Sequence, residues 1–248
     1  MCGINGVFSI NKASDLIVDI KKMNNEIIHR GPDSEGEYVH SGKEYNLAMA
    51  MRRLSIIDLK SGDQPIYSED KSKIIVFNGE IYNFKELKDV FFSNIKFKSK
   101  GDGEVLIHLY QKFGIKFVDK IKGMFSIAII DENKNKTYLI RDRFGIKPLY
   151  YYYDKDKLIF CSEIKGILRG LNQKGELNIK EAFKFFKQGL INSSKETWFK
   201  NIYQVKQSCF LEIDNNNVVE KQYYFIDQKI DENKDLKNKF SFKYYVNE

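Results

Sequence analysis

The chain lacks most features that mark secreted, membrane-spanning and metal-binding proteins. Its 248 residues include only three cysteines, Cys2, Cys161 and Cys209, and three scattered histidines, with no zinc-site spacing among them. No apolar run approaches the roughly 20 residues of a membrane helix, and no basic start followed by an apolar stretch marks a secretory signal. We therefore expect a cytoplasmic protein with reduced thiols, no metal and no membrane partner.

Charge of one sign is not concentrated anywhere in the folded part of the sequence. The net charge is +7, but the lysines are spread along the whole length and alternate with aspartate and glutamate. Apolar residues at 42% and charged residues at 30% are ordinary for a globular protein. Without a basic face or an RNA-binding signature, the composition does not favour a nucleic-acid partner.

Short apolar runs outnumber helical patterns along the chain. Residues recurring at helical spacing, such as Leu16, Ile20, Met23 and Ile27 behind a Ser14/Asp15 cap, predict helices over 16–27, 84–92, 103–113, 162–168 and 179–188. Strands are expected over 2–10, 47–57, 73–81, 124–131, 136–141, 149–153, 158–161, 209–213 and 222–225. Strands and helices do not alternate regularly, which predicts an α+β fold of layered antiparallel sheets.

The composition changes after Gly170. Residues 1–170 are expected to form the main domain, and 171–226, which are rich in lysine and asparagine, a C-terminal extension of it. Residues 227–248 are highly charged and predict a linker or the truncated start of a further domain.

Cys2 is preceded only by Met1. Removal of Met1, which a small second residue permits, would place a thiol beside a free α-amine. With intrinsic pKa values of about 7.7–8.0 for the amine and about 8.5 for the thiol, the amine can accept the thiol proton near neutral pH. This pairing of nucleophile and base is typical of N-terminal-nucleophile enzymes. Cys161, in the run Leu158–Cys161, is instead expected to be buried and structural.

Several motifs occur in order along the first two thirds of the chain. They are Cys-Gly-Ile-Asn-Gly from Cys2, His-Arg-Gly-Pro-Asp from His29, Arg-Arg-Leu-Ser-Ile-Ile-Asp from Arg52, Phe-Asn-Gly-Glu-Ile-Tyr-Asn from Phe77, and Asp-Arg-Phe-Gly-Ile-Lys-Pro-Leu from Asp142. Together they resemble the glutaminase domain of glutamine-dependent asparagine synthetases, a class II glutamine amidotransferase. The resemblance runs from Met1 to about Leu168, with a weaker continuation to Tyr224, and implies an N-terminal-nucleophile hydrolase fold: a four-layer αββα sandwich.

The resemblance also implies the reaction and its catalytic groups. Glutamine would be hydrolysed to glutamate and ammonia through a γ-glutamyl thioester on Cys2. The side-chain amide of Asn78 and the backbone N–H of Gly79 would form the oxyanion hole, for which fixed donors are needed. From the residues alone, Asn78-Gly79 would instead predict a hairpin turn after the strand Ile74–Phe77.

Residues for both ends of free glutamine follow from the same resemblance. Arg53 matches the α-carboxylate position, while Arg52, sent to the opposite face of the strand, is expected at the surface or in a salt bridge. Asp102 and Glu80 match the α-ammonium contacts, and a helix N-cap is a compatible role for Asp102. The remaining pocket residues would be Leu54, Ser55, Ile56 and Ile57.

Other motif residues are expected to be structural. Glu104 is interpreted as a first-turn helix carboxylate, and His29 is not expected to act as a base because the α-amine fills that role. Ion pairs are expected to hold the loops around the pocket through Arg30, Asp33, Asp142 and Arg143.

The expected partners are L-glutamine and a synthetase domain or subunit that accepts ammonia, and the resemblance allows a homodimer. The sequence contains neither a Ser-Gly-Gly-rich pyrophosphate loop nor a P-loop, so ATP and magnesium are expected only on a synthetase domain outside this chain, and no cofactor on the chain itself. The leading hypothesis is ammonia supply for amidation of aspartate in asparagine biosynthesis. Two alternatives remain open: a glutaminase subunit feeding sugar amidation in surface polysaccharide synthesis, and a domain that binds glutamine without turnover.

Overall fold

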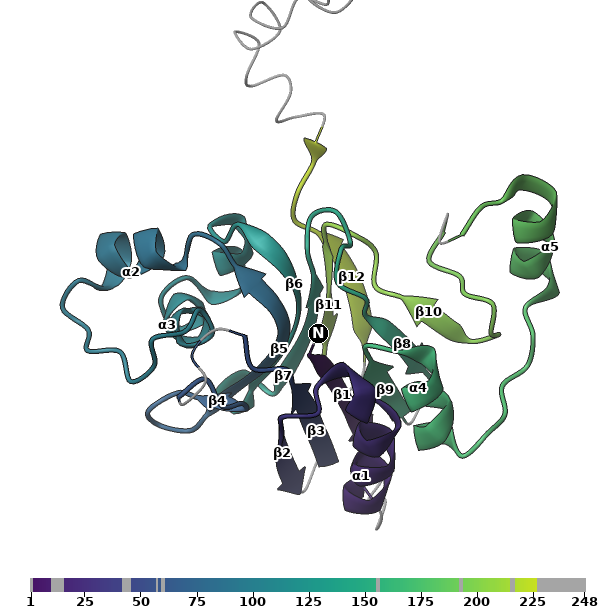
Figure 1. Ribbon diagram of the computed structural model, residues 1–248, viewed down its shortest axis with the longest axis horizontal. Coiled ribbons are helices and arrows are strands. Elements are labelled where there is room, and N and C mark those ends of the chain that lie inside the picture. Colours follow the sequence, from purple (N-terminus) through teal and green to yellow (C-terminus); the bar gives the residue numbers. More distant parts are fainter. Residues whose placement is uncertain are drawn as a thin grey trace, which may run out of the picture.

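The computed structural model describes residues 2–9, 16–41, 46–56, 58, 61–154, 157–191, 194–214 and 217–226. Two six-stranded sheets form its centre, and every strand pairs antiparallel with its neighbours (Figure 1). The first sheet has the order β10 (Ile202–Gln204), β8 (Tyr150–Tyr153), β9 (Lys157–Cys161), β1 (Gly3–Ser9), β3 (Asn46–Arg53) and β2 (Ser34–Ser41). The second has the order β12 (Val218–Gln222), β11 (Cys209–Ile213), β7 (Lys136–Arg141), β6 (Gly123–Asp131), β5 (Lys73–Ile81) and β4 (Ile66–Tyr67).

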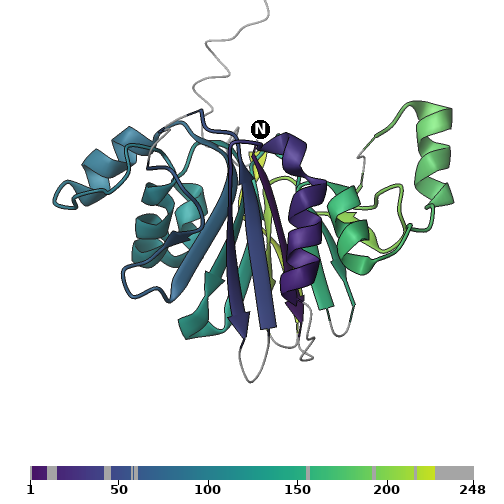
Figure 2. The same ribbon diagram turned by 60° about the horizontal axis from the view of Figure 1, so that its bottom comes forward.

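Helices cover the outer faces of both sheets. The helices α1 (Leu16–Glu26) and α4 (Ile164–Leu171) pack on the first sheet, and α2 (Phe84–Phe92) and α3 (Glu104–Phe113) lie on the second, as Figures 1 and 2 show. The helix α5 (Ile179–Gln188) stands beyond β10. The described residues also form three short 3₁₀ helices: Ile28–Arg30, Gly114–Asp119 and Glu132–Lys134.

Three apolar cores hold these layers together. The central core lies between the sheets and includes Ile4, Met51, Val76 and Leu139, all at most 1% exposed. A second core joins the second sheet to α2 and α3, and a third joins the first sheet to α1 and α4. Burial of apolar side chains on both faces of each sheet fixes the four-layer αββα order, which confirms the expected fold.

Most elements lie where the sequence predicts them. The strands over 73–81, 136–141 and 209–213 and the helices over 84–92 and 179–188 match the expected bounds, and α3 begins one residue later than predicted. Three strands have no counterpart in the prediction: β2, β4 and β10. β2 is a charged, half-exposed edge strand, and the other two are two and three residues long, so none carries a clear apolar period.

Three predictions of detail are wrong. The strand expected over 47–57 ends at Arg53, and the last strand lies over Val218–Gln222 rather than 222–225. Asn78-Gly79 is not a hairpin turn but lies inside β5, opposite Ser126 and Phe125 of β6. A Cβ at Gly79 would lie 2.2 Å from the Met124 carbonyl oxygen, so the neighbouring strand, and not a turn, requires glycine here.

The Ser14/Asp15 cap and the segment 227–248 lie outside the described residues. The division of the chain at residue 170 stays a prediction.

Candidate functional site

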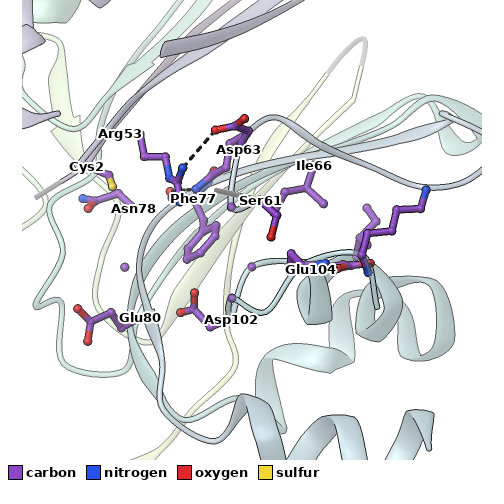
Figure 3. Close-up of a pocket in the computed structure, with 18 of the residues that line it drawn as sticks. Cys2, Arg53, Ser61, Asp63, Ile66, Phe77, Asn78, Glu80, Asp102 and Glu104 are labelled. Atoms are coloured by element: carbon purple, nitrogen blue, oxygen red, sulfur yellow. Dashed lines mark hydrogen bonds and ion pairs between the residues drawn. The ribbon is translucent and has the colours of Figure 1, made fainter. Parts of the chain in front are cut away.

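One end of the sandwich opens into a cavity of about 620 Å³. Cys2 precedes β1, Arg53 ends β3 and Asn78 lies in β5, and these strands contact one another across the sandwich. Figure 3 shows the three side chains at one end of the cavity, with Glu80 and Asp102 also lining it. The fold thus brings together residues that are up to 100 positions apart in the sequence.

The Cys2 sulfur is held against the backbone of Leu54. The Leu54 N–H donates to Cys2 Sγ at 3.4 Å, and the Leu54 carbonyl oxygen lies 3.6 Å from the same sulfur. On the main-chain side, Arg30 Nε donates to the Cys2 carbonyl oxygen at 2.9 Å, and Arg30 also forms a 2.9 Å ion pair with Glu163. These contacts fix the thiol at the cavity wall while leaving it partly exposed.

Asn78 supplies a buried donor without a partner. Its side chain is 1% exposed and lines the cavity, and Nδ2 has no hydrogen-bond partner in the part of the chain that the structure describes. A buried amide N–H without a partner costs free energy on the order of 1–3 kcal/mol. Such a cost is expected at a site whose partner is a ligand.

Among the described residues, no strand covers the edge of β5 beyond β4. β4 pairs only with Ile74 and Ile75. Further along, the Gln64 side chain accepts from the Phe77 N–H at 2.6 Å and donates to the Phe77 carbonyl oxygen at 3.1 Å, and Asp102 Oδ2 accepts from the Ile81 N–H at 2.8 Å. Since backbone groups two residues apart in a strand point to the same edge, the N–H of Gly79 points between these two side chains, into the cavity.

Arg53 crosses the cavity wall with its guanidinium almost fully buried. Nη1 lies 3.1 Å from Asp63 Oδ1, and Nη2 donates to the Asp58 carbonyl oxygen at 2.5 Å. A Cβ on Gly62 would lie 2.4 Å from Nη2, so only glycine leaves room for the guanidinium there. The Arg53 side chain is 6% exposed, but it lines the cavity, and its partner carboxylate on Asp63 is 78% exposed.

The two predicted ammonium contacts lie on the opposite side of the cavity from Arg53, as Figure 3 shows. Asp102 is 7% exposed, and burial, together with the nearby Glu80 charge, raises the pKa of its carboxyl above the usual value, although the Ile81 N–H opposes this shift. The predicted N-cap role is wrong, because Gly103 occupies that position of α3 and Asp102 bonds to β5 instead. Glu104 is the first-turn carboxylate of α3, as predicted.

Two polar residues that hold the cavity walls, Asp58 and Gln64, are among those without a role in the sequence prediction. Asp58 Oδ2 accepts from the N–H groups of Lys100 and Gly101 at 2.8 and 3.1 Å, and Oδ1 accepts from Ser61 at 3.0 Å. Hydrogen bonds from the Ser61 hydroxyl and from these N–H groups lower the pKa of Asp58 to about 2. The other missed residue is Gln64, whose bonds to β5 are given above. Apart from the local bonds between Asp58 and Ser61, the partners are backbone groups of distant segments, which the sequence does not reveal.

The remaining predicted pocket residues divide into three groups. Leu54 and Ile56 line the cavity. Ser55 does not line it, and its N–H bonds to Asp33 Oδ2 at 2.8 Å. Ile57 lies outside the described residues.

The flanking motif residues hold loops mainly through backbone groups, and not through the ion pairs that the sequence suggests. Asp142 accepts four N–H groups, from Phe125 and from residues 144, 146 and 147. Arg143 donates to the Asp119 carbonyl oxygen and lies over the Tyr224 ring. Among the described contacts of these residues, only Arg30 forms an ion pair.

Arg52 and His29 lie away from the cavity. Arg52 is buried rather than at the surface, with a 2.8 Å ion pair to Glu35, so the salt-bridge expectation is confirmed and the surface expectation is wrong. His29 is exposed and lies 2.9 Å from Glu163.

The other two cysteines are in packed surroundings. Cys161 is fully buried, which raises the pKa of its thiol to about 12, and burial raises that of Cys209 to about 11. Within the described ranges, no cluster of three His, Cys, Asp or Glu side chains could hold a metal ion. No helix in these ranges is long and apolar enough to cross a membrane.

The sequence of the chain matches a known protein family and several known proteins. Residues 1–224 match a family described as the glutamine amidotransferase domain. The chain is 44% identical over 221 residues to asparagine synthetase (glutamine-hydrolyzing) 2 of Bacillus subtilis, covering 86% of this chain and 29% of that protein. It is 37% identical over 244 residues to a putative asparagine synthetase (glutamine-hydrolyzing) 2 of Methanocaldococcus jannaschii, covering 91% and 46%. The chain therefore spans less than half the length of these relatives.

Solved structures share the fold. The glutamine phosphoribosylpyrophosphate amidotransferase of B. subtilis superposes with a TM-score of 0.66 at 16% identity, covering 90% of this chain and 50% of that one. An allosteric regulatory enzyme of purine biosynthesis gives a TM-score of 0.67, also at 16% identity, over 90% of this chain and 49% of that one.

We predict opposite pKa shifts for Asp102, which lines the cavity, and Asp58, which does not. Asp58 should titrate near pH 2, because its ionised form accepts several hydrogen bonds, and Asp102 should titrate above 3.8, because burial disfavours its charge. As pH falls, Asp102 therefore becomes neutral first, while Asp58 stays ionised. Carboxyl ¹³C shifts followed by NMR measure both groups; an Asp58 that protonates before Asp102 would contradict the described contacts.

Proposed function

The chain belongs to the glutamine amidotransferase domain family, and from that premise we propose that it hydrolyses L-glutamine to L-glutamate and ammonia. The observation that carries the proposal is the buried Nδ2 of Asn78, which has no hydrogen-bond partner among the described residues and lies in the cavity that also holds the Cys2 thiol. A cysteine nucleophile and a fixed amide donor are what attack on an amide carbonyl needs.

The reaction begins at Cys2 once Met1 has been removed. The free α-amine takes the thiol proton, directly or through water, and the sulfur attacks the side-chain amide carbon of glutamine. The carbonyl oxygen becomes an oxyanion, which accepts hydrogen bonds from Asn78 Nδ2 and the Gly79 N–H at the open edge of β5. These donors lie on a strand paired along its other edge, so they need little reorganisation as charge develops.

Collapse of this intermediate releases ammonia and leaves a thioester. The α-ammonium returns its proton to the leaving nitrogen, and the C–N bond breaks while the C–S bond remains. Water, deprotonated by the α-amine, then attacks the thioester through a second oxyanion in the same position. The C–S bond breaks, the thiol regains its proton, and glutamate leaves.

Recognition of free glutamine uses both walls of the cavity. The Arg53 guanidinium, which already contacts one carboxylate, binds the α-carboxylate. On the other side, Asp102 and Glu80 bind the α-ammonium. A bound ammonium stabilises the ionised form of Asp102, which offsets the burial that raises its pKa.

We propose aspartate as the final acceptor of the ammonia. The supporting observation is that both similar proteins reported above are named as glutamine-hydrolysing asparagine synthetases. The acceptor site would belong to a synthetase domain or subunit, where ATP and magnesium would also bind. A glutaminase that feeds a different amidation would have the same cavity, so the acceptor is tested by adding candidate synthetase partners and aspartate to the chain.

Replacement of Cys2 by alanine should abolish ammonia release, because no other group in the described cavity is a comparable nucleophile. A coupled assay for glutamate measures the loss, and circular dichroism should show an unchanged fold. Cys209→Ala removes a thiol that does not line the cavity and should keep activity if the variant folds. Intact mass should show that Met1 is absent; glutamine hydrolysis by Cys2→Ala would rule out the mechanism.

Replacement of Asn78 by alanine should lower kcat about 100- to 1,000-fold, the usual effect of removing one oxyanion donor. KM should change much less, because the donor acts mainly on the charge of the transition state. Asn133→Ala, which removes an amide that bonds to Ser72, serves as the matched control and should leave kcat unchanged. Steady-state kinetics decide the matter, and a kcat within about threefold of wild type would argue against the proposed role.

A further inference from the structure

We propose that Asp58 is a positioning residue that holds Arg53 and the loop before Asp102 at a fixed separation, and so selects for free α-amino acids. The inference rests on the proposed function, because it assigns the two ends of glutamine to these two side chains. It concerns a residue whose own side chain does not line the cavity.

The first contact joins Asp58 to Arg53. Arg53 Nη2 donates to the Asp58 carbonyl oxygen, and Nη1 contacts Asp63. Gly62 lies next to Nη2, where an added Cβ would come within 2.4 Å of that nitrogen, so the guanidinium has little room to shift. The position of the Asp58 backbone therefore sets where Arg53 presents its charge.

The second contact joins the Asp58 side chain to the segment before Asp102. Oδ2 accepts the N–H groups of Lys100 and Gly101, the two residues that immediately precede Asp102. One residue thus bonds through its carbonyl group to one wall of the cavity and through its carboxylate to the other.

Two helix side chains, Glu104 and Lys88, also hydrogen-bond to the backbone of the 98–101 segment. Glu104 accepts the N–H groups of Lys98 and Ser99 at 2.9 and 2.5 Å. Lys88 Nζ donates to the Gly101 carbonyl oxygen at 3.0 Å. Since Glu104 and Lys88 belong to helices α3 and α2 of the same outer layer, they fix the segment to that layer. Of Asp58, Glu104 and Lys88, only Asp58 connects the 98–101 segment to the side of the cavity that carries Arg53.

The chemistry of Asp58 suits this role. Its φ of +53° lies in the left-handed region, which aspartate and asparagine tolerate better than most residues. Its carboxylate accepts two N–H groups from the 98–101 segment, and Ser61 bonds to both of its oxygens. An asparagine would keep the backbone conformation but would turn an NH₂ group toward donors, so it cannot accept all of these bonds.

Selectivity follows from the separation that Asp58 maintains. A ligand with both an α-carboxylate and an α-ammonium contacts both walls at once, and loses affinity if one wall shifts. A ligand without the ammonium contacts only the Arg53 wall and is less sensitive. Glutaramate, which is glutamine without its α-amino group, is therefore a suitable comparison substrate.

The test is Asp58→Asn in the full chain, with steady-state kinetics on both substrates. We expect KM for glutamine to rise about 10-fold with kcat within about threefold, since binding geometry changes while the chemistry at Cys2 does not. The preference for glutamine over glutaramate, measured as the ratio of kcat/KM values, should fall about 10-fold. Combined with Asp102→Asn, the two losses should be clearly less than additive, because both act on the same contact.

The matched control is Asp154→Asn. Asp154 accepts the Lys157 N–H and the Tyr152 hydroxyl in the β8–β9 connection, so it also bonds through its carboxylate to a loop, but it does not line the cavity. Both kinetic parameters should match wild type in this variant. A thermal melt of each variant separates a change in stability from a change in selectivity.

Two results would overturn the role of Asp58 while leaving the proposed function intact. One is an Asp58→Asn variant with wild-type KM and wild-type preference. The other is an equal fall of kcat/KM on both substrates together with a lowered melting temperature, which would show a purely structural role. A wild-type chain that hydrolyses no glutamine, or whose hydrolysis does not require Cys2, would overturn the proposed function and this inference with it.

Discussion

The cavity depends on an edge of β5 that no other strand in the described part of the chain covers. β4 pairs with β5 only at Ile74 and Ile75, so the backbone groups of β5 from Phe77 onward must find other partners. Gln64 satisfies Phe77 and Asp102 satisfies Ile81. The N–H of Gly79 lies between them on the same edge, and this arrangement is available because β4 is two residues long.

The same edge explains why the site is preorganised. The other edge of β5 is fully paired with β6, and its inner face packs in the central core, so Asn78 and Gly79 have little freedom to move. Their donors face a cavity whose thiol is fixed by a second sheet. Because the two sheets share one apolar core, the distance between nucleophile and donors is set by core packing rather than by a loop.

How far the sequence predicts this structure differs between elements and contacts. β5, α2 and α5 were predicted with correct bounds because each has a clear apolar period. Motif resemblance predicts the other cavity residues, and seven of these line one cavity: Arg53, Leu54, Ile56, Asn78, Gly79, Glu80 and Asp102. Cys2, predicted from its position behind Met1, lines it too.

The failures have a common physical cause. The residues Asn78-Gly79 alone predict a turn, but pairing with β6 keeps this part of the backbone extended. The position of Asp102 before α3 predicts a helix cap, but its carboxylate accepts the N–H of Ile81, 21 residues earlier in β5. Asp58 has a local partner in Ser61, but its bonds to the cavity wall go to backbone groups 42 and 43 residues away. In each case the deciding partner is a backbone group from another segment, which residue types alone do not reveal.

The central claim is that the cavity holds free glutamine with its amide carbon at the sulfur of Cys2. Labelling with an electrophilic diazoketone analogue of glutamine, followed by peptide mass spectrometry, tests it most directly, because the reagent reacts where the amide carbon would lie. The label should be found on an N-terminal Cys2 lacking Met1, at one per chain, and glutamine should protect against it. Label on Cys161 or Cys209, or no label on Cys2 in a chain that hydrolyses glutamine, would contradict the claim.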